Sequence, residues 1–280
     1  MRYVVGYGPR QRGVDGVNLA ATLACSSGAA LDLVAVLPSD APTFHMYSPD
    51  HAFNAELEAQ GHAWLEDGLS RVPTGVRADT QVRRADSITH GLLDAATDPD
   101  RGLAGLIVVG THHRVRAKRF GVGSLADTLL HSSPVPVALA PNGYQFHPGV
   151  SRITCATGMA PGAEDLIDNA IRLATNWRVP LRLMSLVAVG EDSRQEWAEL
   201  AQRHAAALVA KAEAALGEAS SVIGHGDSIR DAIRVVDFAD DEVVMIGSSR
   251  MAQPKRLFVG HSASKIMRAL KVPMIVWPRD

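Results

Sequence analysis

Cysteine is scarce in this sequence, and no apolar stretch is long. The two cysteines, Cys25 and Cys155, exclude a fold held by several disulfide bonds, and their spacing is not that of metal ligands. No uninterrupted apolar run approaches the roughly 18–20 residues of a membrane helix. The first residues, MRYVVGYGPRQRG, contain too short an apolar stretch for the core of a signal peptide. We therefore expect a cytoplasmic protein with no membrane partner.

Neither sign of charge is in excess, because 28 lysines and arginines face 30 aspartates and glutamates. A net charge of -2 argues against a protein whose whole surface grips nucleic acid, so we expect no nucleic-acid partner. The apolar fraction of 46% is that of a globular protein with ample core. At roughly 100–200 residues per domain, a chain of 280 residues predicts two domains.

The chain contains an internal repeat. The segment RYVVGYG begins at Arg2, and RITCATG begins 150 residues later at Arg152. Near the ends of the two copies, residues 133–141 match residues 270–278, where the offset has fallen to 137. Matched order with a drifting offset is what duplication followed by loop shortening leaves behind.

Each copy alternates short apolar strands with helical stretches, which predicts βαβ units and a parallel sheet. We expect two tandem α/β domains, each doubly wound around a five-stranded parallel sheet, with residues 104–110 and 242–247 as central strands. The Asn, Gly and Pro of residues 142–150 predict a linker, so that domain 1 spans 1–145 and domain 2 spans 146–280. The predicted strands are 2–6, 30–37, 78–84, 104–110 and 135–140, then 152–156, 180–187, 219–224, 242–247 and 273–277; the predicted helices of the first copy are 14–27, 51–71, 87–97 and 124–132.

Ligands of doubly wound sheets bind beyond the carboxyl ends of the strands, so the loop after the fourth strand is the first place to search. In the first copy, Gly123 and Ser124 open a helix whose free N–H groups can bind a phosphate, and Ser124 is a candidate helix cap or phosphate donor. The basic residues of 114–119 either clamp that phosphate or form a solvated loop. In the second copy, the corresponding loop spans 247–262 and contains Arg250, Lys255 and Arg256.

These loops resemble the universal stress protein family, whose pattern is Gly, two residues, Gly, nine residues, then Gly followed by Ser or Thr. The four positions are Gly110, His113, Gly123 and Ser124 in the first copy, and Gly247, Arg250, Gly260 and His261 in the second. The resemblance covers essentially the whole chain, and it implies the adenine-nucleotide α-hydrolase-like fold and a loop that cradles ATP phosphates and ribose.

The resemblance implies ATP or another adenine nucleotide as ligand, with magnesium only as its counterion and no other metal. The nucleotide-binding residues that it implies are Tyr7, Val36, Val109, Gly110, His113, Gly123 and Ser124 in the first copy, and Leu186, Ile246, Gly247, Arg250, Gly260, His261 and Ser262 in the second.

Three departures from the family pattern predict that nucleotide binding is weak. The first copy departs less than the second, so we expect any nucleotide to bind there. The middle glycine is replaced by His113 and Arg250, and the acidic residue usual at the end of the first strand is replaced by Tyr7 and Thr157. His261 replaces the Ser or Thr of the second copy, although Ser262 follows it. Tyr7 either stacks on a base or, as we favour, packs as an ordinary buried aromatic.

We expect a binding protein in a stress or regulatory role, not an enzyme. The segment FVGHSAS (258–264) lacks the last glycine of a hydrolase nucleophile elbow, and no histidine follows Ser262. The pairs Asp86-Ser87 and Asp227-Ser228 precede helices and are predicted caps. An adenine-nucleotide enzyme is the weakest hypothesis, because no acid–base constellation is visible.

The alternative function is a ligand-free module that binds partners while its old nucleotide pockets are vestigial. In either case, strands 135–140 and 273–277 are apolar and would otherwise form exposed sheet edges. The resemblance implies that they pair, so that one chain forms an intramolecular pseudo-dimer. A homodimer of whole chains stays open.

Overall fold

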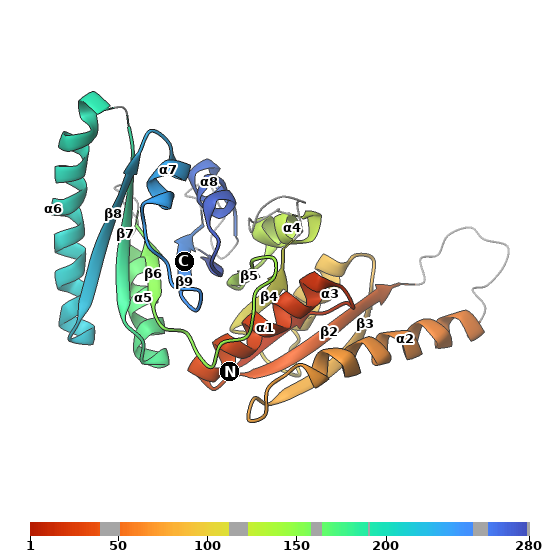
Figure 1. Cartoon of the computed structure of the whole chain (residues 1–280). Coiled ribbons are helices and arrows are strands. Elements are labelled where there is room, and N and C mark those ends of the chain that lie inside the picture. The colour runs from red at the N-terminus through yellow and green to blue at the C-terminus, as the bar shows by residue number, and fades with distance from the viewer. Residues whose placement is uncertain (40–50, 112–122, 158–163, 190, 249–256, 279–280) are drawn as a thin grey trace.

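The protein is an α/β structure of two similar halves that lie side by side (Figure 1). The computed structural model describes residues 1–39, 51–111, 123–157, 164–189, 191–248 and 257–278. The elements of the first half are β1 (Arg2–Gly6), α1 (Gln11–Ser27), β2 (Ala30–Pro38), α2 (His51–Ser70), β3 (Ala78–Ala85), α3 (Ile88–Ala96), β4 (Leu106–Gly110), α4 (Ser124–Ser132) and β5 (Val137–Ala140). Those of the second half are β6 (Ile153–Ala156), α5 (Glu164–Trp177), β7 (Leu181–Ala188), α6 (Glu191–Leu216), β8 (Ala219–Gly226), α7 (Ile229–Arg234), β9 (Val243–Gly247), α8 (His261–Ala269) and β10 (Met274–Trp277).

The predicted order of strands and helices is confirmed, with bounds that differ by at most three residues. Short runs of buried aliphatic residues form the strands, as is usual where both faces of a parallel sheet are covered. The predicted caps are also confirmed: Ser87 and Ser228 each accept a hydrogen bond from a backbone N–H in the first turn of the following helix. Helix α1 ends at Gly28, whose φ of 68° is the left-handed conformation that favours glycine.

The ten strands of the described residues form one sheet in the order β3-β2-β1-β4-β5-β10-β9-β6-β7-β8. Pairing is parallel within each half and antiparallel between β5 and β10, which confirms the predicted contact between the last strands. Strands β4 and β9 are interior, but the middle strands of the two halves are β1 and β6, because the chain winds outward in both directions from them. In the described part of the chain, no helix is long and apolar enough to cross a bilayer.

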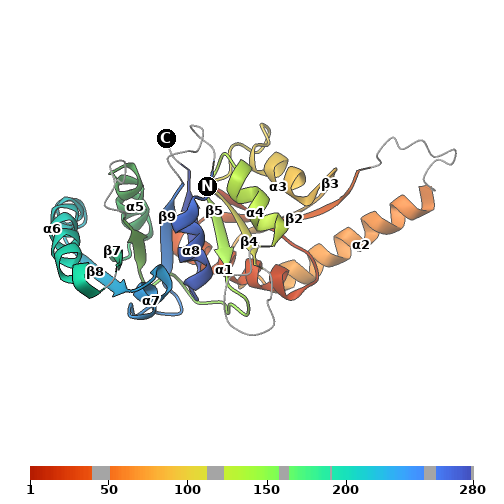
Figure 2. The same cartoon turned by 90° about the horizontal axis from the view of Figure 1, so that it is seen from above.

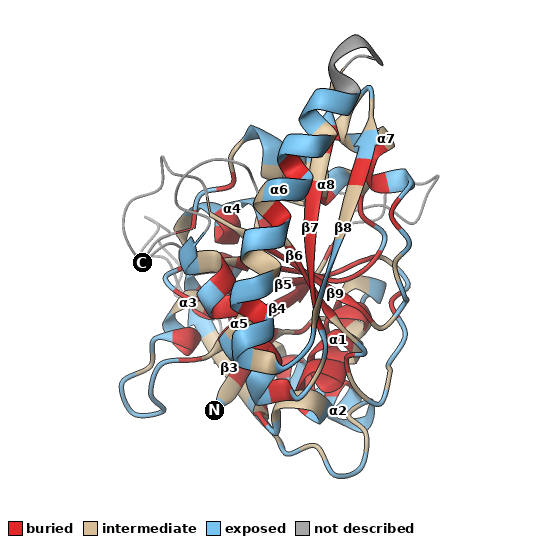
Figure 3. Ribbon diagram, turned by 90° about the vertical axis from the view of Figure 1, so that its left-hand side faces the viewer, coloured by how far each residue is buried: buried red, intermediate tan, exposed pale blue. Residues whose placement is uncertain are grey.

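Helices cover both faces of the sheet, as Figure 2 shows from above. On one face, α1, α2, α5 and α6 enclose one hydrophobic cluster, and on the other, α3, α4, α7 and α8 enclose a second. Each cluster contains residues of both halves, so the core continues across the β5–β10 pair. Figure 3 shows buried strands behind helix α6, whose outer face is exposed.

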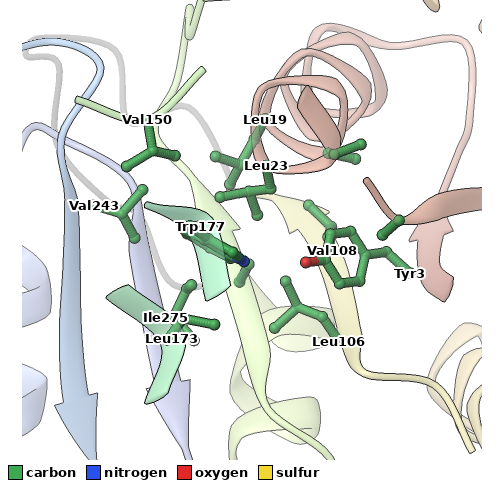
Figure 4. Close-up of a cluster of buried hydrophobic side chains, with 14 of the residues drawn as sticks. Tyr3, Leu19, Leu23, Leu106, Val108, Val150, Leu173, Trp177, Val243 and Ile275 are labelled. Atoms are coloured by element: carbon green, nitrogen blue, oxygen red, sulfur yellow. The ribbon is translucent and has the colours of Figure 1, made fainter. Parts of the chain in front are cut away.

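The junction between the halves is filled by large side chains from both (Figure 4). Tyr3 and Leu19 approach from the first half, Trp177 and Ile275 from the second, and Val150 from the segment between them. At the centre of the strand pair, Ala138 lies opposite Ile275, and these two residues are equivalents in the internal repeat. The pseudo-two-fold axis therefore passes between them.

The linker between β5 and β6, residues 141–152, lies along α1. Four polar side chains at intervals of three or four residues on α1 bind its backbone: Asp15 accepts from Gly143 N (3.0 Å), Asn18 donates to Tyr144 O (2.8 Å), Thr22 accepts from His147 N (3.0 Å) and Ser26 accepts from Val150 N (2.8 Å). The linker is thus part of the folded interface. The predicted boundary at residue 145 lies within it and stays a prediction.

Charged networks join the amino ends of the strands in both halves. In the first half, Asp32 on β2 binds Arg2 and Arg101, each at 2.8 Å. The equivalent of Asp32 in the repeat is Arg182 on β7, and there the acid is the fully buried Glu242, 2.7 Å from Arg182. The sign at one strand position is reversed, yet both networks contain a carboxylate bound by two arginines.

We expect a charge between β5 and β10, the strands that join the two halves, to destabilise the protein strongly. Ala138 and Ile275 are at most 1% exposed, so Ala138→Asp or Ile275→Asp buries an unpaired carboxylate. Each variant should lower the free energy of unfolding by about 3 kcal/mol or more in urea denaturation. Thr80→Asp on the exposed edge strand β3 is the matched control and should change it little. Wild-type stability in both buried variants would contradict the strand pairing.

Alkaline pH should also destabilise the fold. Burial raises the pKa of Tyr3, Tyr7 and Tyr144 from 10.0 to about 12. Their folded pKa exceeds the unfolded one, so their contribution is complete below pH 10 and is lost between pH 10 and 12. In a pH titration of the native protein, tyrosinate absorbance should therefore rise only as the protein unfolds. In guanidinium chloride, where the protein is already unfolded, the same absorbance should rise near pH 10. Ionisation of most tyrosines near pH 10 without unfolding would refute this.

Candidate functional site

A crevice of about 400 Å³ lies at the carboxyl ends of β1, β2 and β4. Its position is the point where the strand order reverses direction, the usual ligand position in doubly wound sheets. Its described lining consists of residues 6–10 with Arg12 and Gly13 from the end of β1 and the start of α1, Val34 and Val36 from β2, Val109 and Gly110 from β4, and Trp64, Ile88 and Leu125 from the helices.

Glycines allow the β1–α1 turn to pack directly against β4. A Cβ atom on Gly110 would lie 1.9 Å from the carbonyl oxygen of Arg12, and one on Gly13 would lie 2.1 Å from that of Gly8. No side chain fits at these distances, so backbone meets backbone on this side of the crevice. Gly110, predicted from the family loop pattern, is therefore needed for this close contact whether or not a ligand is present.

Tyr7 is held against α2. Its hydroxyl donates to the carboxylate of Asp67, which also accepts hydrogen bonds of 3.0 and 3.2 Å from Arg71. Burial, followed by the neighbouring Asp67, raises the pKa of Tyr7 to about 12, while Arg71 and then Tyr7 lower the pKa of Asp67. With 6% of its surface exposed, Tyr7 packs as the favoured interpretation predicted, and it also lines the crevice.

Arginine supplies the charge of the crevice. Arg10 precedes the first residue of α1, Arg12 lies in its first turn, and both line the crevice. No carboxylate belongs to the described lining residues. The basic loop 114–119, where the sequence placed the positive charge, lies outside the described residues, as does His113. The described lining therefore carries positive charge at the start of a helix, which favours an anion there.

The structure brings together four of the seven positions predicted for the first half: Tyr7, Val36, Val109 and Gly110. Gly123 and Ser124 directly precede the lining residue Leu125. Gly123 occupies the cap position of α4 with φ −75°, and Ser124 is the first helical residue. Of the two roles considered for Ser124, that of helix cap is therefore wrong, and that of phosphate donor stays a prediction. A backbone in that conformation leaves its N–H groups at the helix end for another acceptor.

The second half has a separate cavity of about 310 Å³ at the ends of β6 and β7. Its described lining is Thr157, Ser185, Leu186, Val187, Ala188, Val189, Trp197, Ala201 and Ile229. Leu186 is the one predicted position among them. Ile246 is buried in β9, Gly247 ends that strand, Gly260 precedes α8, and His261 and Ser262 begin it. Arg250 lies outside the described residues.

Several lining residues were missed from the sequence. Gly8, Arg10, Arg12 and Gly13 were not among the predicted positions, although glycines after a first strand are themselves a signal. Ile88 directly follows a predicted cap and could have been included. Trp64 had no usable signal, because helix α2 shows little separation of apolar and polar faces.

Metal binding finds no support in the described part of the chain. No group of three His, Cys, Asp or Glu side chains comes together there as a set of ligands.

Comparison with known proteins finds the same family over both halves. A family model described as the universal stress protein family matches residues 1–141 and 149–278. Universal stress proteins of Mycobacterium tuberculosis H37Rv and Mycobacterium bovis are 27% identical to this chain over 297 aligned positions, which cover 99% of this chain and 100% of theirs.

Solved structures share the fold over the whole chain. A universal stress protein from Archaeoglobus fulgidus superposes with a TM-score of 0.67 at 16% identity, covering 100% of this chain and 98% of the other. A protein of unknown function from Pseudomonas aeruginosa PAO1 superposes with a TM-score of 0.59 at 17% identity, covering 100% and 92%. At these identities the likeness concerns the fold alone.

The close contact at Gly110 gives a direct test of the crevice geometry. Gly110→Ala should lower the free energy of unfolding by about 3 kcal/mol, because the β1–α1 turn must move away from β4. Gly123→Ala is the matched control: its φ of −75° suits any residue, so the change should stay within about 0.5 kcal/mol. Equal urea midpoints for Gly110→Ala and wild type would contradict the described packing.

Proposed function

The chain belongs to the universal stress protein family, and we propose that its first half binds an adenine nucleotide weakly, in a stress or regulatory role. The observation that carries the proposal is the crevice at the switch point of the sheet, which combines apolar walls with two arginines. Val34, Val36 and Val109 offer surface to a base, while Arg10 and Arg12 offer charge to phosphates.

The phosphates would lie between the β1–α1 turn and the start of α4. Bare backbone at Gly8, where a Cβ atom would meet nothing within 4 Å, leaves room for close approach, and the first N–H groups of α4 point out of a helix that no side chain caps. Leu125, in the first turn of α4, lines the crevice, so the helix start is within reach of a ligand there. Gly123 would give the phosphates access to that helix start.

Binding without catalysis fits the chemistry of the lining. The titratable groups described there are two arginines and Tyr7, and the pKa of Tyr7 is raised to about 12. The described lining contains no histidine, carboxylate or thiol, the groups that most often serve general acid–base catalysis near neutral pH. We therefore propose a nucleotide-binding protein that is not an enzyme.

Affinity should be low because the described lining of the crevice offers no carboxylate to contact the base. We expect a dissociation constant in the micromolar range or weaker, which is about −8 kcal/mol at best.

Calorimetric titration with magnesium-ATP tests the proposal. Wild type should give saturable heat, and Gly123→Val should abolish it, because a side chain would occupy the space before α4 while φ −75° accommodates valine. Gly260→Val makes the same change at the equivalent position in the second half, where φ is −72°, and should leave binding intact.

Absence of heat in wild type, or equal binding by Gly123→Val, would reject nucleotide binding in the first half. The partner-binding alternative would then replace it. Mass analysis of the denatured purified protein adds an independent measurement, since a co-purified nucleotide would appear there.

A further inference from the structure

The described sheet ends in two outer strands, β3 in the first half and β8 in the second, which are equivalent in the internal repeat. β3 pairs with β2 and β8 pairs with β7, and no other described strand pairs with either of them. The backbone groups of each outer edge are therefore left for water or for a further strand. Figure 3 views the molecule from the β8 end, where the strand is seen beside α6.

Charged side chains protect the edge of β3. Asp79 forms an ion pair with Arg101 at 3.6 Å, Arg83 pairs with Asp98, and Arg84 pairs with a glutamate of α2. A strand that approached this edge would have to displace water from these charges, which is a common way in which sheet edges resist pairing.

The equivalent edge of β8 has no such protection. Its sequence, ASSVIGHG, contains no lysine, arginine, acid or proline, and every residue of the strand is described. Eight consecutive residues keep an unbroken register with β7, so no bulge twists the edge away. A long, regular and uncharged outer strand is the kind of edge that accepts another strand.

The side chains of β8 are complementary to a second copy of themselves. In an antiparallel pair about a two-fold axis, one residue lies opposite its own copy. With Ile223 on the axis, Val222 lies opposite Gly224 of the second copy, and Ser221 lies opposite His225. A large side chain thus faces a position without one, and no acid or base of β8 meets another. Ile223 is only half-buried and belongs to neither of the two hydrophobic clusters, so pairing would cover it with its own copy.

The direction of the backbone groups agrees with this register. In β3, the carbonyl oxygens of Arg77 and Ala85 accept hydrogen bonds from β2, so alternate residues from Arg77 onward face β2 and those between them, such as Val82, face outward. β8 pairs with β7 in the same register, and Ile223 is the equivalent of Val82. Its N–H and C=O groups therefore face outward, as the central residue of a hydrogen-bonded antiparallel pair requires.

Helix α6, which packs beside β8, leaves room for the second copy. Lys211 of α6 forms an ion pair of 2.6 Å with Asp168 of α5, so the opposite side of α6 lies toward the free edge. Ala206 is exposed on that side. At about 1.5 Å per helical residue and about 3.3 Å per strand residue, Ala206 lies roughly level with Ile223. The α6 helices of two copies would therefore pass each other at a small side chain.

We propose that two copies of this chain associate through β8, as an antiparallel pair with Ile223 on the two-fold axis, so that one sheet continues across the dimer. The chain already joins its own halves in this manner, since β5 and β10 pair with the equivalent residues Ala138 and Ile275 opposite each other. The interface consists of one strand pair and its flanking side chains, so the dimer is weak and depends on concentration. It does not depend on nucleotide binding by either half.

Sedimentation velocity of the full chain at rising concentration should show a monomer converting to a dimer. Ile223→Lys places two like charges opposite each other on the axis and should raise the dissociation constant roughly tenfold or more. Thr80→Lys adds the same charge to an exposed position of β3 and is the matched control, so it should leave the dissociation constant unchanged.

A residue on the axis faces its own copy, which permits a test that a folding defect does not imitate. Ile223→Glu alone should be as monomeric as Ile223→Lys. An equimolar mixture of the two variants should form heterodimers, because opposite charges then meet across the axis. Urea midpoints of both variants establish that each is folded before mixing.

Hydrogen exchange of the wild type requires no substitution. A rise in protein concentration should slow amide exchange in peptides that cover residues 219–226, because the outward N–H groups of β8 become paired. Exchange in peptides that cover residues 78–85 should stay the same.

Three results would overturn the proposal: a wild type that is monomeric at its highest soluble concentration, full dimerisation of Ile223→Lys, or a mixture of the folded lysine and glutamate variants that stays monomeric. Exchange in residues 219–226 that is slowed by an added extended peptide, but not by protein concentration, would also reject the dimer and assign β8 to a peptide partner.

Discussion

The antiparallel pairing of β5 with β10 is the contact on which the whole arrangement depends. Each half alone would end in a short apolar strand with an unpaired edge, a surface that invites aggregation. Pairing removes both edges at once and leaves only β3 and β8 as outer strands of the described sheet. Because both hydrophobic clusters continue across this pair, the stability of either half includes side chains of the other.

The two halves have kept their backbone while their side chains have diverged. At the amino ends of the strands, a carboxylate with two arginine partners persists although aspartate in one half corresponds to arginine in the other. Burying Glu242 completely requires such partners, so the balance of charge is constrained more tightly than the identity of any residue. At the carboxyl ends the described linings of the two cavities differ: two arginines belong to the first, and none of the residues described in the second is charged.

The fold was predictable because duplication displays each element twice. Strand 2–6 and its repeat, for example, confirm each other, and the caps Ser87 and Ser228 mark equivalent helices. The residues of the candidate site were harder to predict from the sequence. Tyr7 meets Asp67 across 60 residues of sequence, and Arg12 meets Gly110 only because the turn after β1 folds onto β4. Such contacts depend on packing between distant segments, which periodicity and local motifs do not report.

The pair at the pseudo-two-fold axis has a consequence for how the halves recognise each other. In a dimer of identical subunits, a residue on the axis must face its own copy. Here Ala138 faces Ile275, a small side chain opposite a large one. Two first halves would place alanine against alanine and leave a void, and two second halves would crowd two isoleucines. Duplication within one chain thus allowed the two surfaces to become complementary to each other and mismatched to themselves, which favours the pairing of unlike halves.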